Sequence, residues 1–176
     1  AASSDIGRNI TSTLDLETIF SRTVSLVAER FGLYHTAIYT VEETGFNAVL
    51  QDGTGTAGQE MKKQRYKLPV KPNTVIGSVL STGEAVIVTN SSTDALFKPN
   101  HLLPETRSEA GIPLRVGSRV TGVLDLQSER IDAFHHDDVV LDGIGGGSIH
   151  KGFSGFEQVS VFPVHPGQNH FTFLLF

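Results

Sequence analysis

Residues 111–128 read GIPLRVGSRVTGVLDLQS, with apolar runs on either side of a Gly-Ser pair at 117–118. Gly and Ser are common in tight turns, so this stretch predicts an antiparallel hairpin with strands at 111–116 and 120–127. Gly122, inside the second strand, predicts a bulge or a close approach of helix to sheet. We therefore expect this hairpin to lie within the main β-sheet.

Upstream of the hairpin, residues 13–32 carry the signals of a long helix. Thr13 and Asp15 offer cap residues, and Gly32 follows at a position where helices commonly end. Between them, apolar residues recur every three or four positions: Leu16, Phe20, Val24, Val27 and Phe31. This spacing places one apolar stripe along the helix and predicts that the helix packs on the sheet.

Short β-prone runs and shorter helices complete the pattern. Strands are expected at 36–41, 47–51, 65–70 and 85–89, a helix at 75–81 closed by Gly83, and a final helix beginning at 137–141. The turn at 42–45 is short enough to join the first two strands into a hairpin. Helices with mostly antiparallel strands predict an α+β fold, with a sheet of five or six strands and helices packed on it.

In this order, residues 10–144 resemble the GAF domain, a small-molecule sensory module of bacterial signalling proteins. The matching motifs are LDLE at 14–17, AIY at 37–39, VIGSV at 75–79, TGEAV at 82–86, the stretch 111–128, and Phe134 with the acidic residues that follow it. The resemblance implies a GAF-like sandwich. The first and last helices would cover one face of the sheet, and the 75–81 helix and segment 90–107 would cover the other.

The resemblance also implies a function and leaves alternatives open. It implies a non-catalytic sensory or regulatory domain in a cytoplasmic signal-transduction protein of the histidine kinase or cyclic-dinucleotide enzyme type, acting on an output domain. One alternative is a cyclic-nucleotide-binding domain, although the Asn-Lys pair typical of those domains is missing. The other alternative is a dimerisation scaffold without a ligand. A homodimer is expected through the first helix, where Ile19 and Leu26 lie off the apolar stripe.

Composition excludes several classes of function. None of the 176 residues is Cys, which excludes disulfides, Cys-ligated metals and a thiolate nucleophile. The GAF-like proteins that reduce free methionine sulfoxide, and those that attach a linear tetrapyrrole, depend on Cys as well, so we expect no catalytic residues.

The net charge of -5 gives no basic field for nucleic acid. The sequence contains no run of about 18 consecutive apolar residues, so it predicts no membrane-spanning helix. Without an initial Met or a secretory signal, the chain is expected to be a piece of a cytoplasmic protein.

Two further motifs have simpler explanations than a cofactor site. Adjacent side chains on a helix diverge by about 100°, so His135 and His136 are poorly placed to share one metal ion. The two Asp residues at 137–138 are explained by the positive end of a helix dipole. The glycine-rich stretch 53–58 lacks the Lys-Ser/Thr of a phosphate loop and predicts a flexible loop. No metal site is expected, and the cofactor is left open.

The candidate binding site follows from segment 90–107, a polar connection that is long for a compact domain. We expect a pocket between this segment and the sheet, where the family binds its ligands. Its polar, basic and aromatic side chains favour a small anionic or aromatic ligand. The residues expected to contact the ligand are Phe97, Asn100, His101 and Arg107 from the segment, with Tyr39 and Asp125 from strands.

Composition changes sharply after residue 144. Six of the eleven Phe residues lie beyond it, after a run of three Gly and one Ser at 145–148 that is typical of a flexible linker. The runs 159–165 and 169–176 are β-prone, with Pro-Gly between them. We therefore divide the chain into a sensory domain at 1–144 and a tail at 145–176 that is foreign to it. The alternative is a natural insertion that docks as extra strands.

Overall fold

The computed structural model describes residues 2–116, 118–135, 139–142, 146–150, 158–163 and 171–175. The helices are α1 (Ala2–Phe31), α2 (Gly55–Lys63) and α3 (Val75–Thr82). The strands are β1 (His35–Val41), β2 (Asn47–Gly53), β3 (Lys67–Pro69), β4 (Val86–Val88), β5 (Ser108–Val116), β6 (Arg119–Ser128), β7 (Val139–Asp142), β8 (Gly146–His150), β9 (Gln158–Pro163) and β10 (Phe171–Leu175).

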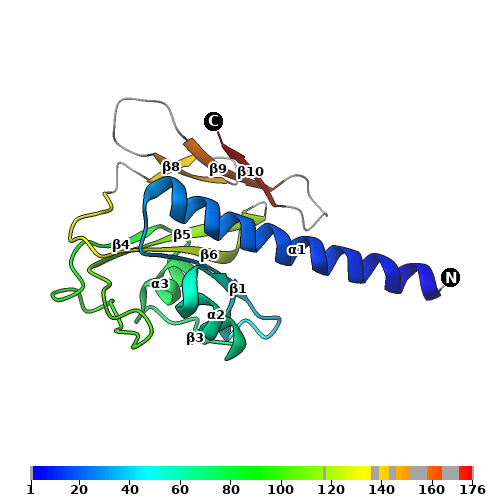
Figure 1. Cartoon of the computed structure of the whole chain (residues 1–176), viewed down its shortest axis with the longest axis horizontal. Coiled ribbons are helices and arrows are strands. Elements are labelled where there is room, and N and C mark those ends of the chain that lie inside the picture. Colours follow the sequence, from blue (N-terminus) through cyan, green and yellow to red (C-terminus); the bar gives the residue numbers. More distant parts are fainter. Residues whose placement is uncertain are drawn as a thin grey trace.

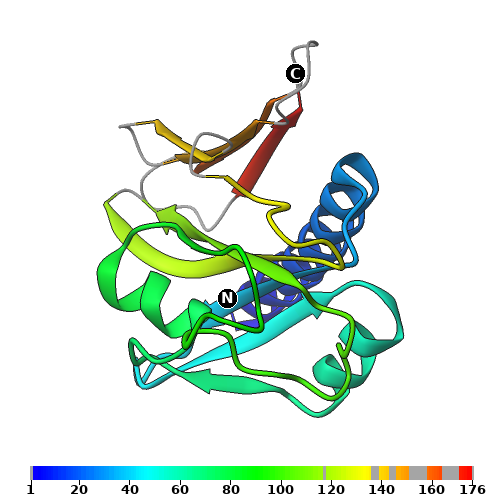
Figure 2. The ribbon, with the colours of Figure 1, turned by 90° about the vertical axis from the view of Figure 1, so that its left-hand side faces the viewer.

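Six strands form the main sheet, in the order β3-β2-β1-β6-β5-β4. Every neighbouring pair in it is antiparallel, and the predicted β5–β6 hairpin lies beside β1 as expected (Figure 2). Both predicted hairpins and the α+β class are therefore confirmed. The sheet brings residues that are distant in sequence, on β1, β5 and β6, next to one another.

Helix α1 covers one face of this sheet. The predicted stripe is confirmed, because Phe20, Val24 and Val27 are buried and pack with the sheet residues Ile38 and Leu124. Gly32 ends the helix with a φ of +60°, a left-handed conformation that Gly adopts without strain. The helix begins at Ala2, earlier than predicted, and its first half extends past the edge of the sheet (Figure 1).

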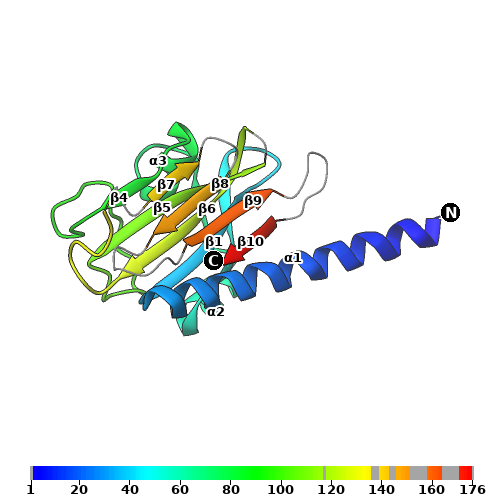
Figure 3. The ribbon, with the colours of Figure 1, turned by 90° about the horizontal axis from the view of Figure 1, so that it is seen from above.

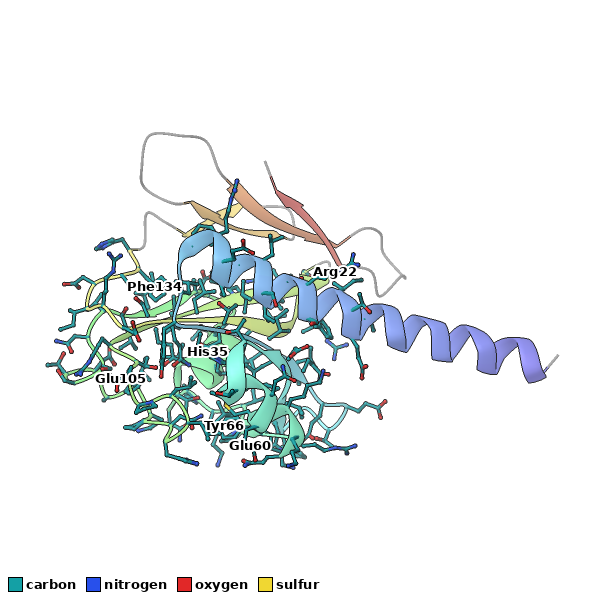
Figure 4. The ribbon with its side chains drawn as sticks, viewed as in Figure 1. Arg22, His35, Glu60, Tyr66, Glu105 and Phe134 are labelled. Atoms are coloured by element: carbon teal, nitrogen blue, oxygen red, sulfur yellow. The ribbon has the colours of Figure 1, made fainter. Side chains whose placement is uncertain are left out.

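The opposite face is covered by α2, α3 and segment 90–107. Leu103 of the segment is buried with Met61 of α2 and Val79 of α3 against Tyr39 and Val123 of the sheet. Figure 4 shows this division, with Phe134 on the α1 side of the sheet and His35 and Tyr66 on the other side. The predicted roof of α3 and segment 90–107 is present.

The predicted bulge at Gly122 is confirmed, but the segment that approaches this glycine closely is the neighbouring strand β1 and not a helix. A Cβ atom added there would collide with the backbone carbonyl of Tyr39 on the neighbouring strand. The β5–β6 register also shifts at this point, because Leu114 pairs with Gly122 while Arg115 pairs with Val120. The glycine therefore permits a close approach of β1 beside a bulge.

The prediction of a flexible loop at 53–58 is wrong, because residues 55–63 form α2. Glycine lowers helix propensity, which concealed the helix in the sequence. Gly55 is explained by its φ of +71°, which favours glycine, and Gly58 by packing. A Cβ atom on Gly58 would lie 2.7 Å from the Cα atom of Gly53, so the helix and β2 are in backbone contact there.

The prediction of a final helix beginning at 137–141 is also wrong for its described part, because Val139–Asp142 forms strand β7. Two consecutive β-branched residues, Val139 and Val140, favour a strand over a helix. Strand β7 pairs with β8, so Gly146–Ser148 of the predicted linker lie in a strand. The remaining residues of the His135–Asp138 motif, 136–138, lie outside the described residues.

A second sheet, in the order β10-β9-β8-β7, lies beside α1 over the same face of the main sheet, where β8 and β9 contact β5 (Figures 1 and 3). The two predicted β-prone runs are strands β9 and β10, paired antiparallel, while the Pro-Gly turn between them lies outside the described residues. The hairpin of β7 and β8 spans the predicted boundary at residue 144. The foreign origin of the tail stays a prediction.

Candidate functional site

A pocket lies between the main sheet and segment 90–107, where the sequence predicts one. It is lined from the sheet by Tyr39, Glu109, Asp125 and Gln127, from the segment by Leu96, Phe97, Lys98, Asn100 and Leu103, and at its sides by Tyr66, Leu68, Thr74, Val75 and Ile76. Its volume is about 40 Å³. Since a water molecule needs roughly 10–15 Å³ on such a measure, the space holds about three waters or one small group.

Strand alternation explains why polar side chains reach this pocket. Successive residues of a strand point to opposite faces of a sheet. Along β6, Leu124 and Leu126 are buried on the α1 side, whereas Asp125 and Gln127 line the pocket. On β1, Ile38 packs on the α1 side, so the next residue, Tyr39, points to the opposite face and lines the pocket.

The register of β5 and β6 places two carboxyl groups together. Gly111 pairs with Asp125 and Glu109 pairs with Gln127, so Glu109 and Asp125 are diagonal neighbours on one face. Their exposed fractions are 7% and 1%. Two buried carboxyl groups this close cannot both ionise at low cost, so the pair retains a proton.

The pKa values of the pair reflect this environment. Burial raises the pKa of Glu109 well above its ordinary value, and the adjacent Asp125 raises it further. Burial also raises the pKa of Asp125, against the opposing effect of the Glu109 and Gln127 side chains that donate to it. Burial raises the pKa of Tyr39 as well, so its phenol keeps its proton and can donate a hydrogen bond.

A chain of hydrogen bonds holds the polar floor of the pocket in place. Thr106 Oγ1 donates to Gln127 Oε1 at 2.6 Å, and Gln127 Nε2 donates to Asp125 Oδ2 at 2.8 Å. The other carboxylate oxygen, Asp125 Oδ1, is buried and accepts from no N–H group or hydroxyl among the described residues, while the Asp125 carboxyl as a whole is also hydrogen-bonded to the Glu109 carboxyl. A buried acceptor without a donor is costly, so this oxygen depends on the one proton that the carboxyl pair retains, on the pocket side of the sheet.

His35 lies on the same face of the sheet as this floor, on the neighbouring strand β1. It pairs with Gln127 across β1 and β6, and it is 1% exposed. Its Nδ1 lies 3.1 Å from the carbonyl oxygen of Thr54, and its Nε2 has no partner among the described residues. Burial lowers the pKa of His35, although Asp125 and the Thr54 carbonyl oppose that effect. The neutral form of the imidazole is therefore favoured, next to Gln127 of the floor.

Segment 90–107 is held over the pocket by its own hydrogen bonds. Asn100 Nδ2 donates to the sulfur of Met61 at 3.2 Å, and its Oδ1 accepts from the backbone of Leu102. The two ends of the segment are joined because Ser91 N donates to the carbonyl of Arg107. These contacts place the half-buried ring of Phe97 at the pocket.

Four of the six residues predicted from sequence come together at this pocket: Tyr39, Phe97, Asn100 and Asp125. The side chains of His101 and Arg107 are exposed and do not line it. Sequence reasoning missed Glu109 and Gln127. Their signal was a polar residue within an otherwise apolar strand, but the pairing register was needed to place them beside Asp125.

Within the described residues, no three His, Cys, Asp or Glu side chains are grouped so that they could hold a metal ion. None of the described helices has the length and apolar character needed to cross a bilayer.

Comparison with known proteins agrees with the resemblance seen in the sequence. The family model described as GAF domain matches residues 15–141, which is most of the chain. The chain belongs to the GAF domain family. GAF domains are small-molecule-binding regulatory modules within larger proteins. No curated protein sequence matches the chain.

Several solved structures share the GAF fold with this chain. The GAF domain of a phosphoenolpyruvate-protein phosphotransferase from Acinetobacter is 21% identical with a TM-score of 0.59, covering 78% of this chain and 83% of that one. A free methionine-R-sulfoxide reductase from Neisseria meningitidis, solved with its substrate, is 23% identical with a TM-score of 0.58, covering 69% and 68%. The NreA protein of Staphylococcus aureus, mutated in its nitrate binding site, is 18% identical with a TM-score of 0.58, covering 70% and 94%.

Proposed function

We propose that this GAF domain is a non-catalytic sensor whose small-molecule ligand binds in the pocket between the main sheet and segment 90–107. The observation that carries the proposal is the buried carboxyl pair of Glu109 and Asp125 on the floor of that pocket, in which Asp125 Oδ1 accepts from no N–H group or hydroxyl among the described residues. Tyr39, Phe97, Asn100 and Asp125 are the proposed ligand contacts from the predicted set, joined by Glu109 and Gln127. His101 and Arg107 are left out because their side chains do not line the pocket.

The size of the pocket also bears on the ligand. A space of about 40 Å³ takes a small group, whereas a cyclic nucleotide would need the segment to move away from the sheet. The proposal therefore favours a ligand much smaller than a nucleotide. Cyclic-nucleotide binding and a scaffold without any ligand are the rival functions, and the screen below separates them.

Absence of catalysis is part of the proposal, because some GAF-fold proteins are reductases. The chain has no cysteine that could donate electrons to a sulfoxide. With free methionine-R-sulfoxide and dithiothreitol, we expect no methionine to form above the rate without protein. Turnover that depends on the protein would contradict this part of the proposal.

A thermal-shift screen of small metabolites, including cyclic nucleotides, tests ligand binding. A ligand at 100 times its dissociation constant stabilises the folded chain by about 2.7 kcal/mol. The variant Leu96→Trp places a larger side chain in the pocket wall, so it should abolish the shift. Phe46→Trp is the matched control, because Phe46 is 77% exposed and does not line the pocket.

The outcomes of the screen are distinct. A shift that survives Phe46→Trp and disappears in Leu96→Trp supports the pocket as the ligand site. A cyclic nucleotide as the best compound would support the first rival. If no compound shifts the wild-type chain, the scaffold function replaces the sensor.

The proposed setting is a larger cytoplasmic signalling protein of the histidine kinase or cyclic-dinucleotide enzyme type, with this domain acting on its output domain as a homodimer. Helix α1 supports the dimer, because it extends past the sheet and Leu26 on it is 38% exposed (Figure 1). Light scattering should give the mass of two chains. A single-chain mass at millimolar concentration would contradict the dimer.

A further inference from the structure

The sequence-based expectation is a small anionic or aromatic ligand, and the chemistry of the pocket floor differs from the anionic part of it. That expectation depended on His101 and Arg107, whose side chains do not line the pocket. The carboxyl groups of Glu109 and Asp125 line it instead. Among the described lining residues, Lys98 alone is basic, and its exposed ammonium donates to the carbonyl of Ala95 at 3.3 Å. The deep part of the pocket is therefore acidic.

The acidic floor has a specific unfilled position. Gln127 occupies Oδ2 of Asp125, and Thr106 in turn holds Gln127 in that orientation. Oδ1 of Asp125 has no N–H or hydroxyl donor among the described residues, so only the proton shared with the Glu109 carboxyl is available to it, and Asp125 is only 1% exposed. A donor supplied from inside the pocket would satisfy this oxygen and lie against Glu109 at the same time.

The walls around this position are aromatic. The rings of Tyr39, Tyr66 and Phe97 line the pocket on three elements of the structure. The faces of aromatic rings attract cations, most strongly where water is excluded. An anion would meet two carboxyl groups and the negative faces of rings, so the same environment disfavours it.

We propose that the pocket binds a small organic cation through a primary ammonium group placed between Asp125 Oδ1 and Glu109. The proposal rests on the proposed function and names the chemical class of its ligand. An ammonium group has three donors, enough for Asp125 Oδ1, Glu109 and the hydroxyl oxygen of Tyr39. A pocket of about 40 Å³ has room for such a group and a short stem.

A divalent metal ion is a poorer occupant of this position. Calcium takes six to eight oxygen ligands, and magnesium demands a near-octahedral set. The described residues offer no group of three metal-ligating side chains, here or elsewhere. Two carboxyl groups flanked by aromatic rings match an ammonium group better.

Binding should be linked to the proton that the carboxyl pair retains. Ammonium favours the ionised form of both groups, so its binding displaces that proton. The other titratable groups facing the pair are His35 and Tyr39 on β1 and Tyr66 next to β3, with Lys98 at the mouth. The affinity for an amine should therefore rise as the pH rises from about 5 to 8, while the amine itself stays charged.

Matched pairs of amines and carboxylates test the charge preference. Methylamine, ethylamine and propylamine are compared with acetate, propionate and butyrate, which carry the same alkyl groups, by NMR titration of the ¹⁵N-labelled full chain. We expect at least one amine to bind tenfold more tightly than every carboxylate, with amide shifts at Gly111 and Asp125. If no amine binds more tightly than its carboxylate counterpart, the proposal is overturned.

Variants locate the effect on the floor. Glu109→Gln and Asp125→Asn should each weaken amine binding at least tenfold, and circular dichroism verifies that each variant is folded. Glu105→Gln is the control, because it removes the same charge from an exposed position that does not line the pocket. Amine affinity that is unchanged in both folded floor variants would overturn the proposal. If either variant does not fold, the pH dependence of amine binding to the wild-type chain is the deciding measurement. An amine affinity that rises with pH supports the proposal, and one that is constant or falls overturns the proposal.

Failure of this proposal and failure of the proposed function are distinguishable. A neutral or anionic metabolite that depends on the pocket in the Leu96→Trp screen would leave the sensor function standing and overturn the cationic ligand class. If no metabolite stabilises the chain and no amine or carboxylate changes its NMR spectrum, both the sensor function and the cationic ligand class are overturned.

Discussion

Substituting Gly58 by Ala separates two explanations of the glycine-rich stretch 53–58. If the stretch were a flexible loop, the change would be neutral or slightly stabilising, because Ala lowers the entropy of the unfolded chain. In a free helix it would also stabilise, by about 1 kcal/mol of helix propensity. The structure predicts the opposite sign, because Gly58 is buried where α2 contacts the backbone of Gly53.

The magnitude follows from what would have to move. The added Cβ atom would lie 2.7 Å from the Cα atom of Gly53 and closer still to its carbonyl group. A backbone group cannot rotate away as a side chain can, so α2 must shift from β2, and with it the fully buried Met61. Overpacking costs about 1–3 kcal/mol, and the upper end applies against a rigid backbone. After the propensity gain of about 1 kcal/mol, the net loss is about 2 kcal/mol.

Urea denaturation of Gly58→Ala and the wild type measures this loss. A change of about 2 kcal/mol corresponds to a melting temperature lower by about 4–8 °C in a chain of 150–250 residues. Thr56→Ala is the control, since Thr56 is exposed in the same helix and should change stability by less than about 0.5 kcal/mol. Equal or greater stability of Gly58→Ala would refute the backbone contact between α2 and β2.

Two further predictions concern a helix cap and the carboxyl pair. Thr74 caps α3 by accepting from Gly77 N at 3.0 Å, so Thr74→Ala should lower the free energy of unfolding by about 1 kcal/mol while Thr74→Ser preserves it, as measured in urea. The raised pKa values of Glu109 and Asp125 mean that the folded chain holds a proton that the unfolded chain releases. Their contribution to stability is complete below the ordinary carboxyl pKa and is lost as the pH rises toward the folded-state value. Wild-type stability should therefore fall more steeply than that of Glu109→Gln as the pH rises above about 4, and parallel curves would contradict this.

Local sequence patterns determined most of the main sheet and two of its helices. The α1 stripe, its stop at Gly32 and the α3 helix closed by Gly83 depend on residues within a few positions of one another, so short-range spacing was sufficient. The same holds for the two hairpins, whose strands are adjacent in the chain. The order of these elements along the chain was also sufficient to indicate the GAF fold.

Other features depend on contacts between distant segments, which local patterns do not contain. Helix α2 was hidden because its glycines oppose helix formation; Gly58 is required by packing on Gly53, and Gly55 by its φ of +71°. The segment 139–142, with its apolar run at 139–141, pairs as a strand with residues 146–149, instead of continuing as a helix. The acidic pocket floor exists because the β5–β6 register brings Glu109 beside Asp125 and burial changes their charge. The side chains were readable in the sequence, but their pairing and protonation were decided by the tertiary structure, since both depend on register and on exclusion from water.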